Sequence, residues 1–185
     1  MIIGNKEFKD RTYIMGILNV TPDSFSDGGT HNTIDKALKH TEKMIKEGAD
    51  IIDVGGESTR PGYTLISDEE EISRVVPVIE KIKANFDIPI SIDTYKSNVA
   101  KAAAKAGADL LNDIWGFKYD ENIAKTAYEY NMSCCLMHNR KEPVYDNYIE
   151  DVLSDLKDSL DIAQKHNIDK NKILLDPGVG FAKSY

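Results

Sequence analysis

One repeated pattern constrains the fold of this chain more than any other feature: short apolar, largely β-branched runs alternate with stretches that have helical spacing. The apolar runs are residues 14–18, 51–54, 90–92, 110–111, 134–137 and 173–175. Strands that alternate with helices form a parallel sheet through right-handed crossover connections. The sequence therefore predicts an α/β fold, and no linker or low-complexity tract divides it.

The segments between these runs carry the apolar spacing of amphipathic helices. The first has Ile34, Ala37, Leu38, Thr41 and Ile45, which follow the i, i+3, i+4, i+7, i+11 pattern of one helix face. Further helices are predicted around residues 72–82, 101–106, 122–130 and 149–163. Two helices run into the same tripeptide, Gly-Ala-Asp, at residues 48–50 and 107–109. Because glycine readily adopts the left-handed conformation that closes a helix, these matching turns indicate a repeated βα unit.

Polar residues at the strand ends decide between two α/β architectures. They lie at or just after the ends of all six apolar runs: Asn19, Asp53, Asp93, Asn112, Asp113, His138 and Asp176. A closed barrel gathers all its strand ends around one mouth, whereas an open doubly wound sheet uses mainly those at its switch point. We therefore expect a (β/α)8 TIM barrel. A full barrel needs about 250 residues, so we expect residues 1–185 to be one barrel domain, truncated after the sixth strand.

Charge and cysteine content exclude several classes of protein. The chain has 23 Lys and Arg against 31 Asp and Glu, a net charge of −8. An acidic surface does not attract a phosphate backbone or an anionic membrane, so we expect no nucleic acid and no membrane as partners. No signal peptide is readable, and we expect a cytoplasmic protein. The two cysteines, Cys134 and Cys135, are adjacent and point to opposite faces of a strand, so they cannot pair with each other.

Five segments, in the same order along the chain, resemble the motifs of the dihydropteroate synthase family. Residues 14–29 read IMGILNVTPDSFSDGG, and residues 48–62 read GADIIDVGGESTRPG. The shorter motifs are SIDT at 91–94, LNDI at 111–114 and DPGVGF at 176–181. A single motif of this kind is weak support, but five in register are specific.

The resemblance implies a (β/α)8 barrel that joins para-aminobenzoate to (7,8-dihydropterin-6-yl)methyl diphosphate, with Mg²⁺ on the diphosphate, and releases pyrophosphate. It also implies that Asp93, Asn112 and Asp176 bind the pterin and that Asn19 is the metal-linked residue. Thr59 and Phe181 are expected among the substrate contacts. Arg60 is expected to contact either the benzoate carboxylate or the diphosphate.

The residue types suit this chemistry. A pterin edge presents an amino group beside a ring N–H, and a buried carboxylate can accept hydrogen bonds from both donors. The amide of Asn112 can both donate and accept. Asn19 offers a neutral oxygen, which suits a Mg²⁺ ion that keeps several waters and is held largely by substrate phosphates. The long segments at 20–31 and 55–66 are expected to cover the site.

Two other functions stay open from the sequence. One is a pterin-binding methyltransferase domain of the same barrel type; the other is a truncated pterin-binding or self-associating fragment without turnover. An open six-stranded sheet exposes two unpaired edges, which favours association, and we expect a homodimer. His138 remains open between a structural and a functional role. Asp113 is expected to anchor a loop, and Trp115 to pack near the site.

Overall fold

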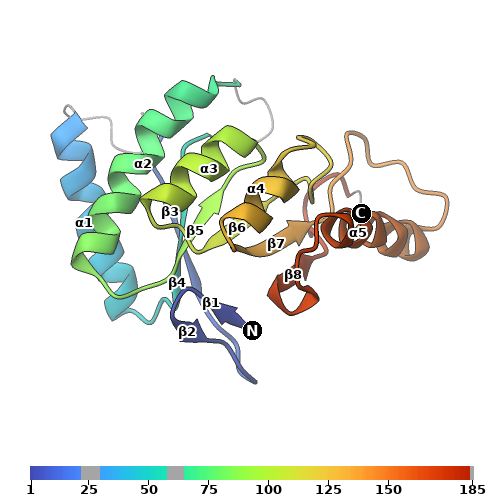
Figure 1. Ribbon diagram of the computed structural model, residues 1–185, viewed down its shortest axis with the longest axis horizontal. Helices are drawn as coiled ribbons and strands as arrows, with labels where there is room; N and C mark the ends of the chain where they lie inside the picture. The colour runs from blue at the N-terminus through green and yellow to red at the C-terminus, as the bar shows by residue number, and fades with distance from the viewer. Residues whose placement is uncertain (22–29, 58–64, 184–185) are drawn as a thin grey trace.

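The main element of the structure, a computed structural model, is a six-stranded parallel sheet whose strands pair in chain order (Figure 1). Residues 1–21, 30–57 and 65–183 are described. The strands are β3 (Met15–Asn19), β4 (Ile51–Gly55), β5 (Ile90–Asp93), β6 (Leu110–Asp113), β7 (Ser133–Met137) and β8 (Ile173–Asp176). Pairing in strict chain order is typical of a barrel wall, whereas a doubly wound sheet reverses its order at a switch point. The predicted barrel class is confirmed over these six strands.

The helices follow one another in chain order along one side of this sheet (Figure 1). They are α1 (Thr30–Lys46), α2 (Asp68–Asn85), α3 (Ser97–Ala106), α4 (Ile123–Glu129) and α5 (Tyr148–Lys165), with a short 3₁₀ helix at Lys170–Lys172. Ser67 caps α2, because its side chain accepts a hydrogen bond of 3.2 Å from Glu70 N. Gly107 ends α3 with φ 111°, as the Gly-Ala-Asp tripeptide predicts.

The core lies between the sheet and the helices. Successive strand residues point to opposite faces, so Ile52 and Val54 of β4 pack toward the helices while Ile51, Asp53 and Gly55 face the barrel interior. The helix side of the core is completed by buried residues of α2: Val75, Val78, Ile79 and Ile82. This alternation leaves the inner face free to carry polar groups near the strand ends.

An N-terminal hairpin, β1 (Ile2–Ile3) paired with β2 (Lys6–Glu7), packs against the amino-terminal ends of the parallel strands. The apolar pattern of the sequence predicts no strand before residue 14, so the hairpin is an addition to the expected fold. Ile3 is fully buried against Ile51 and Leu110, which are interior residues of β4 and β6. The two-residue Gly-Asn connection between the hairpin strands was the readable signal, since such pairs favour tight hairpin turns.

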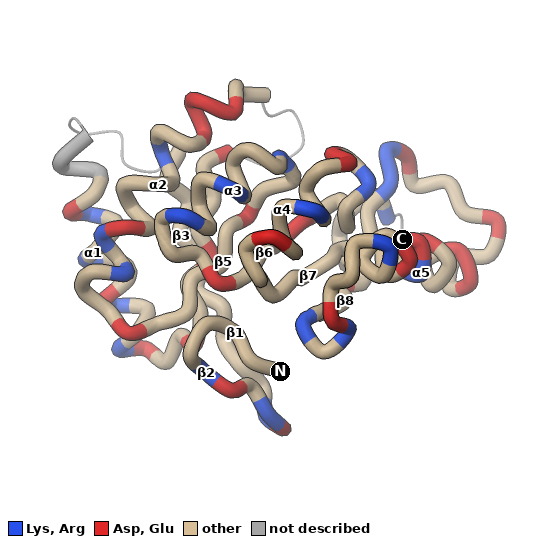
Figure 2. Tube along the Cα trace, in the orientation of Figure 1, with Lys and Arg blue, Asp and Glu red and all other residues tan. Residues whose placement is uncertain are grey.

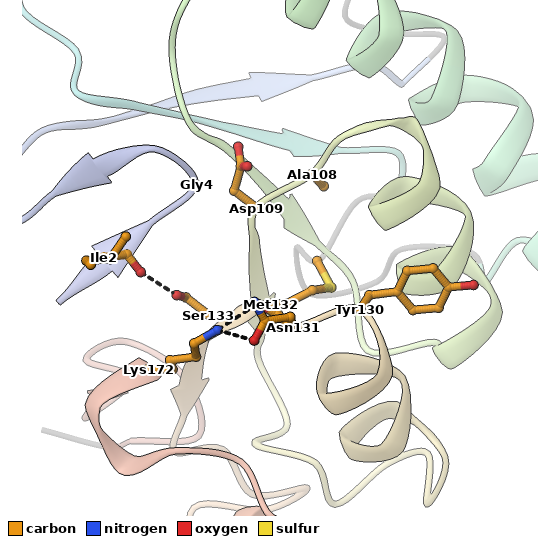
Figure 3. Close-up of a pocket in the computed structure, with 9 residues that line it drawn as sticks. All are labelled: Ile2, Gly4, Ala108, Asp109, Tyr130, Asn131, Met132, Ser133 and Lys172. Atoms are coloured by element: carbon orange, nitrogen blue, oxygen red, sulfur yellow. Dashed lines mark hydrogen bonds between the residues drawn. The ribbon is translucent and has the colours of Figure 1, made fainter.

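A cavity of about 400 Å³ lies between this hairpin and the starts of β6 and β7 (Figure 3). Its polar groups are engaged in holding the junction together. Ser133 Oγ donates to Ile2 O at 2.9 Å, and Lys172 Nζ donates to Asn131 O at 3.0 Å. The carboxylate of Asp109 accepts from Lys83 Nζ and from a backbone amide of β5. The cavity is therefore a structural junction at the end of the sheet opposite the polar strand ends.

The outer surface carries both signs of charge, and α5 is predominantly acidic (Figure 2). The first and last strands, β3 and β8, each pair with one neighbour in the described sheet. Apolar side chains are exposed there: Ile17 on β3 is 64% exposed and Leu174 on β8 is 41% exposed. None of the helices, over the described residues, combines the length and apolarity needed to cross a bilayer. Both cysteines are free.

Candidate active site

Strand register places four residues in one row across the carboxyl ends of neighbouring strands. Asn19 of β3 lies opposite Gly55 of β4, Gly55 lies opposite Asp93 of β5, and Asp93 lies opposite Asn112 of β6. Residues opposite each other in register point to the same face of a sheet. Three of the predicted site residues therefore share the inner face at one level.

Gly55 separates two oxygen donors in this row. A methyl group at Gly55 would lie 3.4 Å from Asn19 Oδ1 and 3.5 Å from Asp93 Oδ2. Because glycine has no side chain, Asn19 Oδ1 and Asp93 Oδ2 can both lie close to the backbone at this position. Oxygen donors of this kind suit Mg²⁺. In the part of the chain that the structure describes, no three His, Cys, Asp or Glu side chains converge on a possible metal position.

Asp53, two residues before Gly55, adds a second buried carboxylate to the inner face. It is 4% exposed, and its Oδ2 accepts a hydrogen bond of 3.1 Å from Asn112 Nδ2. Burial raises the pKa of Asp53, and the hydrogen bond from Asn112 offsets part of that effect. The contact orients the amide so that Asn112 Oδ1 remains available as an acceptor.

Asp93 is the most electrostatically strained group of the site. Burial raises its pKa well above the usual range, and the nearby charges of Asp53, Glu71 and Asp113 raise it further. Its Oδ1 atom is buried and has no hydrogen-bond partner among the described residues. A buried acceptor of this kind is costly unless a ligand supplies the donor. The site is therefore prepared for a ligand that presents N–H groups to Asp93.

Asp176, at the end of β8, lies opposite Met137 of β7. Its Oδ1 accepts from Gly178 N at 2.7 Å, and its backbone oxygen accepts from His138 N at 2.8 Å. Both bonds fix the strand end. They leave Oδ2 of the same carboxylate as the atom that can accept a hydrogen bond from a ligand.

Gly178 is required at its position for two independent reasons. Its φ is 65°, and a Cβ atom there would overlap His138 O. Gly178→Ala is therefore expected to lower the free energy of unfolding by about 3 kcal/mol, combining left-handed strain with a backbone clash. Gly180→Ala is the matched control: its φ is 93°, but no atom of the described residues lies within 4 Å of a Cβ there, so a loss of only about 1 kcal/mol is expected. Urea unfolding of both variants checks this, and equal losses would contradict the clash.

An apolar wall stands beside these polar groups. Tyr95, Ile114 and Met137 form a buried cluster, and Trp115 and Phe181 pack against it. Met137 ends β7 and the other residues follow β5, β6 and β8, so the wall is assembled from four separate strand ends. Flat aromatic and aliphatic side chains next to buried hydrogen-bonding groups suit a planar heterocycle with a polar edge. Trp115 packs near the site, as predicted.

A buried ionic cluster supports the β4 and β5 ends from behind. Lys96 Nζ lies 2.8 Å from Glu57 Oε2 and 2.8 Å from Glu71 Oε2, and it donates to Ile66 O at 2.9 Å. Tyr95 OH also donates to Glu57.

Burial lowers the pKa of Lys96, but its bonds to the two glutamates outweigh this and the net shift is upward. The net pKa shifts of the two glutamates have opposite signs. Burial raises the pKa of both; the bonds from Lys96 and Tyr95 reverse the shift for Glu57 and not for Glu71.

Asp113 anchors the loop after β6, as expected from the sequence. It is fully buried on the helix side of the sheet and accepts from Trp115 N at 2.8 Å and Phe117 N at 2.7 Å. Burial raises its pKa to about 6 despite these backbone hydrogen bonds. It therefore shapes the apolar wall without facing the interior.

The predicted site residues fall into three groups. Asn19, Asp93 and Asn112 share one row; Asp176 and Phe181 reach the site from β8 and the loop after it. Thr59 and Arg60 lie outside the described residues. Three interior groups were not assigned to the site from sequence: Asp53, Ile114 and Met137. Asp53 and Met137 could have been found from strand alternation, because Asp53 shares the parity of Gly55 and Met137 that of Cys135.

Comparison with known proteins gives a consistent picture. A sequence model of the family described as "Pterin binding enzyme" matches residues 15–185. The dihydropteroate synthase of Clostridium beijerinckii is 63% identical, over 100% of this chain and 70% of its own length. That of Bacillus subtilis is 56% identical, over 96% of this chain and 62% of its own length.

Solved structures show the same likeness. The dihydropteroate synthase of Clostridium difficile, crystallised in the presence of pteroic acid, aligns with a TM-score of 0.93 and 50% identity over 100% of this chain and 68% of that chain. A Xanthomonas albilineans dihydropteroate synthase with 4-aminobenzoic acid aligns with a TM-score of 0.87 and 44% identity over 95% of this chain and 64% of that chain. The present chain thus spans roughly two thirds of the length of these relatives.

Proposed function

The chain belongs to the dihydropteroate synthase family of pterin-binding transferases, and from this premise we propose that it binds (7,8-dihydropterin-6-yl)methyl diphosphate and condenses it with para-aminobenzoate. The observation that carries the proposal is the buried, unpartnered Oδ1 of Asp93 in the row formed by Asn19, Gly55 and Asn112. A pterin amino group and ring N–H would supply the donors that Asp93 lacks among the described residues.

The two buried carboxylates support both recognition and chemistry. The Oδ1 atom of Asn112, whose amide is held by Asp53, can accept a hydrogen bond from the pterin ring. Oδ2 of Asp176, at the end of β8, offers the ligand a further acceptor. The C–O bond to the diphosphate breaks with its electron pair on the leaving group, and the amine nitrogen of para-aminobenzoate bonds to the methylene carbon and loses a proton. Positive charge that develops on the pterin is stabilised by Asp93 and Asp53, whose positions are fixed beforehand in a buried site. No covalent enzyme intermediate is needed.

We assign Mg²⁺ to the Asn19 side of the row. Asn19 Oδ1 lies across Gly55 from Asp93 and is a neutral, hard oxygen donor of the kind that this ion prefers, and the substrate diphosphate would supply further oxygens. The ion would neutralise charge on the diphosphate leaving group. Asn19 would orient it relative to the pterin edge.

Two measurements on the 185-residue protein test the proposal. Calorimetric titration with pteroic acid asks whether the site binds a pterin, and binding is expected. Pyrophosphate release from the pterin diphosphate is then measured with para-aminobenzoate or Mg²⁺ omitted in turn. Release that requires both supports the synthase reaction. Binding without release restricts the function of this chain to pterin binding, and absence of binding by folded protein overturns the proposal.

We also propose a homodimer and a cytoplasmic location. The edges of β3 and β8, each paired on one side only in the described sheet, support association, and the two free thiols suit a reducing compartment. Sedimentation velocity over a range of concentrations is expected to show a dimer. A monomer at every concentration would contradict this.

A further inference from the structure

His138 is a buried histidine for which the proposed reaction has no role. It follows the end of β7, and its side chain is fully buried between α5 and the loop after β8. Nε2 lies 3.0 Å from Asp155 Oδ2, and Nδ1 lies 3.0 Å from Lys183 Nζ. Both ring nitrogens are therefore used inside the protein.

These contacts define the state of the ring. An ammonium group can only donate, so Nδ1 must accept from Lys183. Nε2 then carries the proton and donates to Asp155, whose Oδ2 also accepts from Arg140 Nε at 2.6 Å. Burial lowers the pKa of His138, and the charge of Lys183 acts in the same direction against the bond to Asp155. The neutral ring thus connects Asp155 of α5 to Lys183 in the loop after β8.

The same lysine controls the backbone of that loop. Besides the ring, Lys183 Nζ donates to Phe181 O at 2.8 Å and approaches His138 O at 3.4 Å. Phe181 N in turn donates to Gly178 O at 3.0 Å. The loop carries Phe181 of the apolar wall and begins directly after Asp176.

The loop also contains a strained residue. Ala182 has φ 45°, in the left-handed region that non-glycine residues rarely adopt, and its carbonyl accepts from Tyr145 OH at 2.7 Å. A strained conformation persists only where surrounding contacts hold it. Here the contacts come from Lys183 on one side and Tyr145 on the other.

We propose that His138 is a positioning residue for the pterin site: by accepting a hydrogen bond from Lys183, it holds loop 177–183 so that Phe181 and Asp176 face the ligand. This rests on the proposed pterin-binding function. The role belongs to the Nδ1 side of the ring, whereas the Nε2 contact with Asp155 supports packing on α5. Substitutions can remove the contact at Nδ1 and the contact at Nε2 separately.

His138→Asn places an amide oxygen near the position of Nδ1 and retains an acceptor for Lys183. His138→Gln reaches toward Nε2 and retains a donor for Asp155 but loses that acceptor. Lys183→Met removes the donor from the less buried end, which guards against failure of the histidine variants to fold. Asp155→Asn is the matched control, because it alters the Nε2 side of the ring and leaves the contact between Nδ1 and Lys183 in place.

The first readout needs no ligand: hydrogen exchange of the Phe181 amide, and acrylamide quenching of Trp115, the single tryptophan, which packs in the same cluster as Phe181. His138→Gln and Lys183→Met are expected to speed exchange by about tenfold and expose Trp115 to quencher. His138→Asn and Asp155→Asn are expected to remain within about threefold of wild type.

The second readout is pteroic acid affinity, expected to fall about tenfold in His138→Gln and Lys183→Met and to be preserved in His138→Asn and Asp155→Asn. The double variant is expected to be no worse than Lys183→Met alone, because Lys183→Met already removes the contact with the ring together with the bond to Phe181 O. Unchanged loop exchange in His138→Gln overturns the inference, and so does a loosened loop with wild-type affinity. Equal loss of affinity in His138→Asn and His138→Gln also overturns it, since the ring would then act only through packing. Failure of the wild-type protein itself to bind pteroic acid is a different result, which removes the proposed function and this role with it.

Discussion

Asp93→Asn is expected to weaken pteroic acid binding by about a hundredfold and, at the same time, to stabilise the ligand-free protein. Binding falls because an amide cannot accept two parallel N–H donors as a buried carboxylate does, and charged hydrogen bonds of this kind are strong. Stability rises because the substitution removes a buried charge that lies among Asp53, Glu71 and Asp113 and has an unpartnered Oδ1 within the described chain. A gain of about 1–2 kcal/mol in the free energy of unfolding is expected at pH 7. Calorimetric titration and urea unfolding measure the two effects separately.

The stability gain has a predicted pH dependence. Because the pKa of Asp93 is raised in the folded protein, the folded state binds more protons than the unfolded state between about pH 3.8 and that raised pKa. The wild-type carboxyl therefore costs more stability as pH rises from 3.8 through its folded pKa, and the advantage of the Asp93→Asn variant over the wild-type protein grows over the same interval. At lower pH, where the carboxyl is protonated in both the folded and the unfolded state, the advantage disappears.

Asp50→Asn serves as the control for this pair of effects. Asp50 accepts from Arg11 and from Ile14 N at the other end of the sheet, and the bond from Arg11 lowers its pKa. Its substitution is expected to reduce stability and leave affinity unchanged, the reverse of the Asp93 result. If Asp93→Asn destabilises the ligand-free protein, or binds pteroic acid like wild type, the assignment of Asp93 to the pterin is wrong.

Lys96→Met is expected to cause the largest loss of stability, about 3–5 kcal/mol, because it leaves Glu57 and Glu71 buried without their shared cation. The side chains of Lys96, Glu57 and Glu71 are only 11%, 3% and 2% exposed, so water cannot replace the lysine without rearrangement. The loss is measured by urea unfolding followed through circular dichroism and Trp115 fluorescence. A protein of typical domain stability would keep only a small margin.

Two further variants identify the cause of that loss. Adding Glu57→Gln and Glu71→Gln to Lys96→Met removes the uncompensated charges and is expected to recover at least half of the lost stability. Lys46→Met is the matched control: its pair with Glu42 is exposed on α1, with side chains 70% and 50% accessible, so a change below about 0.5 kcal/mol is expected. A loss in Lys96→Met no greater than in Lys46→Met would show that the cluster does not stabilise the fold.

The sequence predicted the strands and helices well because the signals are local. Each strand run is short, apolar and bounded by polar or turn residues, and each helix has a continuous apolar face. The N-terminal hairpin was missed because its strands are only two residues long and contribute little periodicity. Its role depends on Ile3 packing against Ile51 and Leu110, which are remote in sequence.

The site was predicted in part. The chemical identity of the strand-end residues, and their match to family motifs, named Asn19, Asp93, Asn112, Asp176 and Phe181. The partners of these residues could not be named in the same way. The bond from Asn112 to Asp53 spans 59 positions, and that from Lys183 to His138 spans 45.

Three features can be read from the amino-acid sequence alone: the order of the βα units, the alternation that turns one face of each strand inward, and the polar residue at each strand end. These depend on neighbours within a few positions, and backbone geometry then assigns them a face. Tertiary structure alone decided the register that aligns Asn19, Gly55, Asp93 and Asn112, and it decided which charges face one another. Burial and distance set the strained state of Asp93 and the neutral ring of His138, and both arise only when distant strands meet.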